Sequence, residues 1–434
     1  MLTNLNKRLR GIFYGWWIVG ACFLLHFLTG GTVVYGLAAF FNPIIKEMGW
    51  TRAQISFAFA MRSIEGGLVQ PFVGFFVDRI GTRKCIFAGM IIMSLAFLLM
   101  SRISSLSIFY ASTFLLAFGG TLSSGIPQQS AVANWFRRRR SLCIGLLTAG
   151  TGLSGIMAPV MVLLINSYGW RQTLVFISPL ILIIGIPLSF LIRHRPEPYG
   201  YLPDGDKAEE QVAGDTRTGT SGHARAFSEE GLTVKECLKT RTFWLLMGAQ
   251  LFVGFASQAI QVHAIPYLTG MGITENIAAL TITGITITSL IGRLGFSFLG
   301  DIYDKKRLLM IAFAMETIGI FIFASIRSPL MIIPFIIFYA PGFGAPIPLI
   351  PSIQADCFGT KNFASIRGLG AFSYTIPGIA GPFLAGWLYD LLGNYDLAFI
   401  ILAVLCTFSI PIIMFAKLTP LKSMTATPEK SISR

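Results

Sequence analysis

Apolar runs of about 20 residues recur along this chain and are separated by short polar segments. A run of this length spans the hydrocarbon core of a bilayer when it is helical. We expect twelve membrane-spanning helices, over residues 12–43, 53–77, 84–102, 107–133, 141–167, 171–193, 242–268, 275–299, 307–326, 330–354, 366–389 and 395–416.

The twelve runs fall into two halves that repeat. MGWT at 48–51 returns as MGIT at 271–274, and Asp78 returns as Asp301, each 223 residues later. We therefore predict an all-α integral membrane protein whose twelve transmembrane helices form two pseudo-symmetric six-helix bundles. The predicted parts are an N-terminal bundle (1–193), a cytoplasmic polar linker (194–241), a C-terminal bundle (242–416) and a cytoplasmic tail (417–434).

Composition and charge agree with a membrane protein. The chain is 54% hydrophobic and 12% charged, whereas soluble domains carry about 25% charged residues. Its net charge of +14 comes from Lys and Arg residues that gather at the termini and in alternate loops. By the positive-inside rule both termini are cytoplasmic. We also expect the protein to lie in the plasma (inner) membrane and to be a monomer. The basic residues therefore set the orientation of the helices in the membrane, and the net positive charge does not indicate nucleic-acid binding.

One apolar run carries a cation in its interior. Arg293 lies about 12 Å from Asp301, where the next polar loop begins, at the rise of an α-helix. Ionisable residues inside a membrane are costly and usually functional. Ser289 and Ser297, one turn away on either side, cannot neutralise it, and arginine has no accessible neutral form. We predict that Arg293 binds an anion in a water-filled cavity.

A pair of opposite charges is expected inside the second apolar run. Arg62 and Glu65 are three residues apart, so they share a helix face and can pair. The pair can be structural. Alternatively, Glu65 carries a coupled proton, since burial favours the neutral carboxyl, or Arg62 is a second anion anchor. The sequence leaves these interpretations open.

The loops that follow the second and eighth runs carry charges at equivalent positions. Asp78, Arg79 and Arg83 lie at the first, and Asp301 lies at the second. We expect these charges to bridge helix ends when that side closes, which is a gating role. The basic run at 137–140 is interpreted as topogenic and facing lipid.

The sequence holds no signature of an enzyme or of a bound cofactor. The six cysteines have neither metal-ligand nor disulfide spacing, and they are interpreted as small buried hydrophobic residues. The glycines follow helix-packing spacings, and no Gly-Lys-Ser/Thr phosphate loop is present. We expect no enzymatic activity, no cofactor and no metal site.

Several motifs resemble the major facilitator superfamily, and within it the monocarboxylate and oxalate/formate branch. They are GFFVDRIGTRK (74–84), WFRRRRSLCIGLLTAGTGLSG (135–155), YGWW (14–17), YGWR (168–171) and YGYLPDGD (199–206). The resemblance implies the two-lobe transporter fold and places Arg293 where the branch keeps its substrate-binding arginine. Ser289 stands where mammalian-type carriers have an acidic residue, and Ile376 and Pro377 where oxalate carriers have a lysine. One cation without a partner favours a single carboxylate over a dianion.

Uncharged polar residues complete the predicted site. Phenol and amide groups can hold the second oxygen of a carboxylate without adding charge. His263 is included because it can titrate near neutral pH, whereas His26 and Glu316 are interpreted mainly as hydrogen-bonding residues. The predicted cavity residues besides Arg293 are Tyr35, Gln128, Gln129, His263, Tyr339 and Tyr374.

These observations predict a secondary active transporter that works by alternating access. Its partners would be a small organic anion, most simply a monocarboxylate carried with a proton, and the lipid bilayer. Anion exchange, or carriage of a dicarboxylate with Arg62 as second anchor, is the alternative. A non-transporting sensor on the same scaffold is a remote one, because the polar linker is too short to form an output domain.

Overall fold

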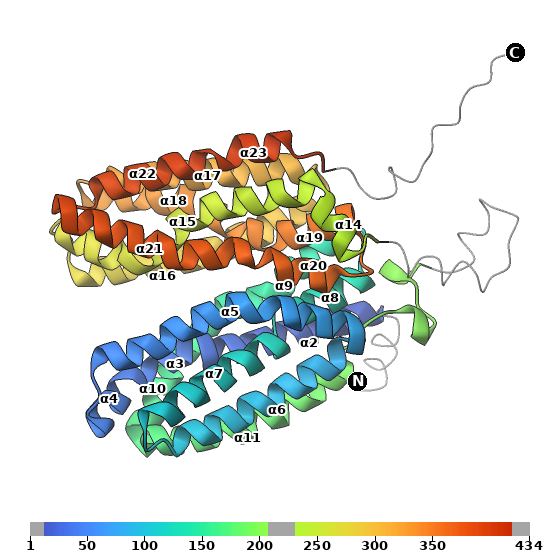
Figure 1. Cartoon of the computed structure of the whole chain (residues 1–434), viewed down its shortest axis with the longest axis horizontal. Coiled ribbons are helices and arrows are strands. Elements are labelled where there is room, and N and C mark those ends of the chain that lie inside the picture. Colours follow the sequence, from blue (N-terminus) through green and yellow to red (C-terminus); the bar gives the residue numbers. More distant parts are fainter. Residues whose placement is uncertain (1–12, 207–230, 419–434) are drawn as a thin grey trace, which may run out of the picture.

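A computed structural model describes residues 13–206 and 231–418, apart from the side chains of residues 52, 53, 56 and 59–66. Within these ranges twelve long helical segments form two bundles, one from each half of the sequence (Figure 1). The predicted all-α, two-bundle architecture is confirmed, and most predicted boundaries agree to within a few residues.

The first bundle begins with an interrupted helix and is built from six segments. They are α2 (Tyr14–Thr29) with η1 (Gly30–Tyr35), α3 (Gly36–Ala39) and α4 (Phe41–Met48); α5 (Arg52–Ile80); α6 (Thr82–Ser101); α7 (Leu106–Ser123) with α8 (Ile126–Trp135); α9 (Arg140–Leu153) with η2 (Ser154–Ile156) and α10 (Met157–Tyr168); and α11 (Trp170–Leu191).

The second bundle follows a short helix, α14 (Val234–Lys239), and also has six segments. They are α15 (Arg241–Gly270); α16 (Glu275–Gly300); α17 (Lys305–Ala324); η5 (Pro329–Met331) with α18 (Ile332–Gly344) and α19 (Pro346–Phe358); α20 (Phe363–Gly370) with α21 (Phe372–Leu392); and α22 (Asp396–Thr407) with α23 (Ser409–Phe415).

Ten of the twelve segments are long and apolar enough to cross a membrane by length and composition, among the described residues. The other two are α5 and the pair α20 and α21. These segments contribute Gln70, Arg367, Tyr374 and Thr375 to the lining of a cavity between the bundles.

The repeated MGxT motif ends one helix and begins the next. Gly49 and Gly272 have positive φ values of 68° and 82°, which a residue with a side chain rarely adopts. Thr51 then caps α5, because its hydroxyl accepts from the N–H of Gln54 at 3.2 Å while the Gln54 side chain accepts from the N–H of Thr51 at 2.9 Å. Thr274 holds the equivalent position before α16 but makes no side-chain capping hydrogen bond, so the two halves share the glycine turn and not the cap.

Each bundle has its own buried core. One core cluster includes Ile18, Phe97 and Trp135 of the first bundle, and another includes Phe243, Phe335 and Phe399 of the second. Because the two large cores are separate, the bundles can keep their internal packing while they move relative to each other.

The bundles meet at one end, which we call the linker end because α11 finishes there and α14 and α15 begin there (Figure 1). Asp301 follows α16 and accepts from the N–H groups of Ser141 and Leu142, which open α9 of the other bundle, at 2.9 and 3.0 Å. The carboxylate thus satisfies two of the unpaired N–H groups at that helix start and faces its positive dipole end.

The repeat produces the reciprocal contact. Asp78 accepts from the N–H groups of Ala364 and Ser365, which open α20, at 3.2 and 2.8 Å. These residues lie 223 positions after Ser141 and Leu142. Each bundle therefore caps a helix of the other with an equivalent carboxylate.

A group of charges lies beside these caps. Asp356 of α19 forms salt bridges with Arg140 of α9 and with Lys305 of α17. Arg140 also donates to the carbonyls of Phe136 and Ala133, at 3.0 and 3.2 Å. The interpretation of the whole basic run as lipid-facing is therefore wrong for Arg140, which is buried between the bundles.

The start of the polar linker is packed against the first bundle. Asp204 accepts from the N–H groups of Arg137 and Arg138, and Arg138 also pairs with Asp206 at 3.0 Å. The end of the linker forms the short helix α14, which Thr233 caps. Linker residues 207–230 and the tail beyond residue 418 lie outside the described residues.

We expect Asp301→Asn to weaken the closed linker end. The amide oxygen can still accept one N–H group, but the amide nitrogen cannot accept the second, a loss of about 0.5–2 kcal/mol for a helix cap. Thermal unfolding of the purified protein should show a lower Tm, and Cys143, buried in α9, should react faster with a maleimide. Asp390→Asn, an exposed position on α21, is the matched control. Unchanged Tm and labelling in Asp301→Asn would contradict the role of this cap.

Candidate functional site

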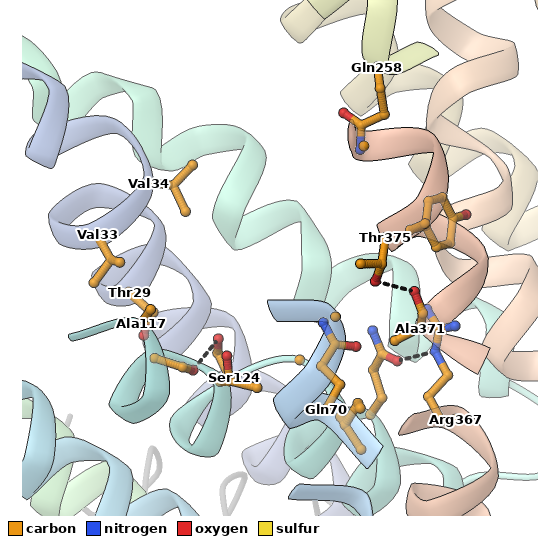
Figure 2. A pocket seen from close by; sticks show the side chains of 18 residues that line it. Thr29, Val33, Val34, Gln70, Ala117, Ser124, Gln258, Arg367, Ala371 and Thr375 are labelled. Atoms are coloured by element: carbon orange, nitrogen blue, oxygen red, sulfur yellow. Dashed lines mark hydrogen bonds between the residues drawn. The ribbon is translucent and has the colours of Figure 1, made fainter. Parts of the chain in front are cut away.

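A cavity of about 510 Å³ lies between the two bundles (Figure 2). Its lining comes from α2, η1, α5, α7 and α8 of the first bundle and from α15, α20 and α21 of the second. Apart from glycines, the described lining residues are Thr29, Val33, Val34, Gln70, Ala117, Thr121, Ser124, Ile126, Gln129, Gln258, Arg367, Ala371, Tyr374 and Thr375.

Arg367 is the cation among these lining residues. It lies in α20, and its Nε donates to Oε1 of Gln129 in the other bundle, at 3.2 Å (Figure 2). The described lining residues include no Asp or Glu, and Arg367 makes no salt bridge within the described part of the chain. A guanidinium presents five donors, so most of its hydrogen-bonding capacity is open to an anion in the cavity.

Arg293 lies at the same interface between bundles but is not among the residues that line this cavity. It is buried in α16, and its Nη1 donates to the carbonyl of Thr148 in α9, at 2.7 Å. Its Nε has no hydrogen-bond partner among the described residues. Tyr35, at the end of η1, lies within electrostatic range of the guanidinium. The anion-binding role of Arg293 stays a prediction.

The remaining predicted cavity residues divide into two groups. Gln129 and Tyr374 line the cavity. Gln128 is fully buried and is bonded to the His26 ring and to the Ser123 carbonyl, and the latter distance is 2.8 Å. These partners occupy its amide inside the first bundle.

Tyr339 and His263 are also directed into the second bundle. Tyr339 is buried and its ring stacks between Phe335 and Phe343. His263 lies 3.2 Å from the hydroxyl of Tyr395 and 3.0 Å from the carbonyl of Pro382. The structure does not bring either residue to the lining of the cavity.

The predicted gating residues also differ in their contacts. Asp78 and Asp301 join the two bundles, as described above. Arg79 is exposed, with its guanidinium 5.9 Å from the Phe75 ring. Arg83 donates to the carbonyl of Phe190, so its contact stays within the first bundle.

The side chains of Arg62 and Glu65 lie outside the described residues, and the three interpretations of that pair stay open. The buried Glu316 accepts from the hydroxyl of Ser257 in α15, as its interpretation as an inter-helix hydrogen-bonding residue predicts.

Sequence reasoning missed Arg367. The charge distribution counts it with the basic loop between the tenth and eleventh helices, although the predicted run begins at residue 366, because it lies at the edge of that run. In the structure the helix begins at Phe363, so Arg367 lies a full turn inside it. The available signal was the glycines beside it, Gly368 and Gly370, because glycines let two helices pack closely. A Cβ at Gly368 would lie 2.5 Å from the Gln70 carbonyl oxygen, so α20 packs directly against α5 of the other bundle.

The pKa values of two carboxyl groups, one at each end of the molecule, shift in opposite directions. Burial raises the pKa of the Asp301 carboxyl at the linker end, and the N–H groups of Leu142 and Ser141 oppose that shift. At the opposite end the hydrogen bond from Arg171 holds the pKa of the Glu47 carboxyl below its usual value. The Arg171 contact, at 2.8 Å, ties α4 to α11 within one bundle.

Comparison with known proteins supports the same architecture. The model of the Major Facilitator Superfamily matches residues 19–292 and 246–433. Monocarboxylate transporter 12 of Mus musculus is 24% identical over 435 residues, 96% of this chain and 88% of that protein. Monocarboxylate transporter 13 of Bos taurus is 26% identical, over 89% of this chain and 86% of that protein. The oxalate:formate antiporter of Oxalobacter formigenes is 25% identical, over 91% of each.

Solved structures of this fold are also similar. The proton:xylose symporter XylE has a TM-score of 0.73 at 13% identity and covers 95% of this chain and 99% of its own. FucP in the outward conformation has a TM-score of 0.67 at 17% identity and covers 92% of this chain and 98% of its own. At these identities the likeness shows the fold alone.

We expect opposite stability effects at the half-buried Arg367 and the buried Arg140. Arg367→Gln removes a cation that no described carboxylate compensates, so the empty protein should gain Tm, by about 1 °C for each kcal/mol gained in a chain of this length. Arg140→Gln leaves Asp356 with only Lys305, so Tm should fall. Differential scanning fluorimetry in the absence of organic acids measures both. A clear loss of Tm in Arg367→Gln would argue that this residue is structural.

Proposed function

The chain belongs to the Major Facilitator Superfamily, and on that premise we propose that it carries a small organic anion across the membrane by alternating access. The observation that supports this most directly is an arginine in a cavity between the two bundles, with no carboxylate among the described lining residues. A cation in such a site costs free energy unless an anion compensates it. We therefore infer that this site favours a negatively charged ligand.

We propose that the carboxylate of the cargo binds Arg367, with Gln129 holding the guanidinium in position. Tyr374, from the next helix, is placed to add a hydroxyl donor to the same site. Arg293 is the second proposed anchor, because its Nε is unpartnered and its helix faces α9 of the other bundle. Two arginines from the second bundle can then hold the cargo while the first bundle moves.

The contacts at the linker end indicate how access would alternate. The two carboxylate caps, the Arg140–Asp356 pair and the bond from Ser141 to Ser352 at 2.8 Å all join the bundles there. The charge distribution favours a cytoplasmic location for this end, with both termini inside the plasma (inner) membrane. The described state would then be closed to the cytoplasm, and release would require both caps to open.

Proton symport is the coupling we favour. An anion that enters an inside-negative cell opposes about 2.3 kcal/mol per 100 mV for each charge, and a co-transported proton cancels that cost. Exchange against an internal anion is the alternative, and a name among the relatives, the oxalate:formate antiporter, describes such exchange.

Uptake into proteoliposomes tests the anion site. With radiolabelled lactate, oxalate and gluconate in separate assays, we expect at least one acid to accumulate, and Arg367→Gln to lower its initial rate about tenfold or more, the effect of losing one strong ionic contact. Arg293→Gln should lower it as well. Arg241→Gln removes an exposed arginine and is the control. Wild-type rates in Arg367→Gln and Arg293→Gln would refute the proposal.

An imposed pH gradient separates the two coupling modes. Vesicles without internal anion should accumulate the acid when the outside is made more acidic, and an uncoupler of the proton gradient should abolish this. Accumulation that occurs only when the vesicles are preloaded with an organic anion would establish exchange instead.

A further inference from the structure

Three glutamines, from both bundles, surround the cavity. They are Gln70 of α5, Gln129 of α8 and Gln258 of α15, and Figure 2 shows Gln70 and Gln258 on either side of Thr375. Within the described part of the chain, the side chains of Gln70 and Gln258 make no hydrogen bond, and Gln129 uses only its oxygen, toward Arg367. Gln70 and Gln258 therefore face the cavity with both donors and acceptors unused, and Gln129 with its donors unused.

Hydroxyl groups add to this polar lining. Thr375 and Ser124 donate to carbonyls of their own helices, at 3.3 and 3.0 Å, so their oxygens can still accept. The hydroxyl of Thr29 is buried and has no partner among the described residues. The cavity thus offers several separate hydrogen-bonding groups besides the cation.

Alternating access makes these groups costly for an apolar cargo. When the site closes, water leaves, and every amide that the cargo does not pair is left buried and unsatisfied. A simple alkyl carboxylate pairs only with the groups that hold its carboxylate and leaves the amides of Gln70 and Gln258 without a partner. The volume of about 510 Å³ also lies in the range of pockets that hold drug-sized ligands, so the site accommodates more than a two-carbon or three-carbon acid.

Part of the lining is apolar. Val33, Val34 and Ala117 of the first bundle lie across the cavity from Gln258, Arg367 and Thr375 of the second, beside the hydroxyls of Thr29 and Ser124 (Figure 2). A hydroxylated carbon chain matches this mixed lining, because its hydroxyls can meet the polar groups while its C–H groups pack against the apolar ones. An ammonium group has no described carboxylate to receive it in this lining, which disfavours amino acids.

We propose that the cargo is a polyhydroxylated monocarboxylate of the aldonic-acid type, bound by its carboxylate at Arg367 and by its hydroxyls at Gln70, Gln129 and Gln258. This inference rests on the proposed function and adds the chemical class of the cargo. The polar groups beyond the cation are then the specificity determinants of the site.

Three six-carbon probes separate the contributions. Gluconate has the carboxylate and the hydroxyls, hexanoate has only the carboxylate, and sorbitol has only the hydroxyls. Binding to the purified full-length protein, followed by calorimetry and by the shift in Tm, should favour gluconate over hexanoate by about tenfold or more, or 1.4 kcal/mol. Sorbitol should bind more weakly than gluconate by at least the same factor.

Two variants test independently whether polar groups of the cavity bind the hydroxyls of the cargo. Gln258→Leu, which preserves approximate volume, and Thr375→Val, which is isosteric, should each weaken gluconate binding and leave hexanoate binding unchanged. Arg367→Gln should weaken both acids. This pattern would assign the hydroxyl-binding role to Gln258 and Thr375 and the carboxylate-binding role to Arg367.

The outcomes that overturn the two proposals differ. If hexanoate binds as tightly as gluconate and both depend on Arg367, the anion carrier stands and the polyhydroxylated cargo is refuted. If neither acid binds, the cargo proposal also fails. If sorbitol binds as tightly as gluconate, or if Arg367→Gln leaves gluconate binding unchanged, the anion site itself is refuted.

Discussion

A carboxylate that caps a helix in the opposite bundle is the contact on which the arrangement of this molecule depends. Asp301 and Asp78 each accept two main-chain N–H groups across the interface. Because a capped helix start is specific in position and direction, these contacts fix how the bundles meet at the linker end. The bundles have separate large cores, so only interface contacts must change when the molecule moves.

The cavity exists because the bundles meet at that end while polar helices face each other farther along. α5 and the pair α20 and α21 are the segments whose composition falls short of an ordinary span. Close packing of Gly67 beside Thr375 and of Gly368 beside Gln70 brings these helices together. Their polar side chains then line a shared space, whereas in an isolated helix they would face lipid at a cost.

The repeat has diverged where the two halves need different chemistry. The caps are equivalent in both halves, but Arg293 corresponds by the same spacing of 223 residues to Gln70, and Arg140 corresponds to Phe363. The first half therefore contributes amides and apolar groups to the interface cavity, and the second contributes its cation. In such an asymmetric site the charge of the cargo is held by the second bundle, while polar groups of both bundles line the rest of the cavity.

The sequence by itself determined the twelve helices, the two bundles and the equivalence of Asp78 and Asp301, because apolar run length and a constant repeat spacing are local or periodic signals. It also identified Arg293 as an unusual buried cation. Only the tertiary structure decided that Arg367 lines the cavity while Gln128, Tyr339 and His263 do not, and that Arg140 faces Asp356 instead of lipid. Which side of a helix faces the other bundle depends on packing between distant segments, and no pattern within one segment carries that information.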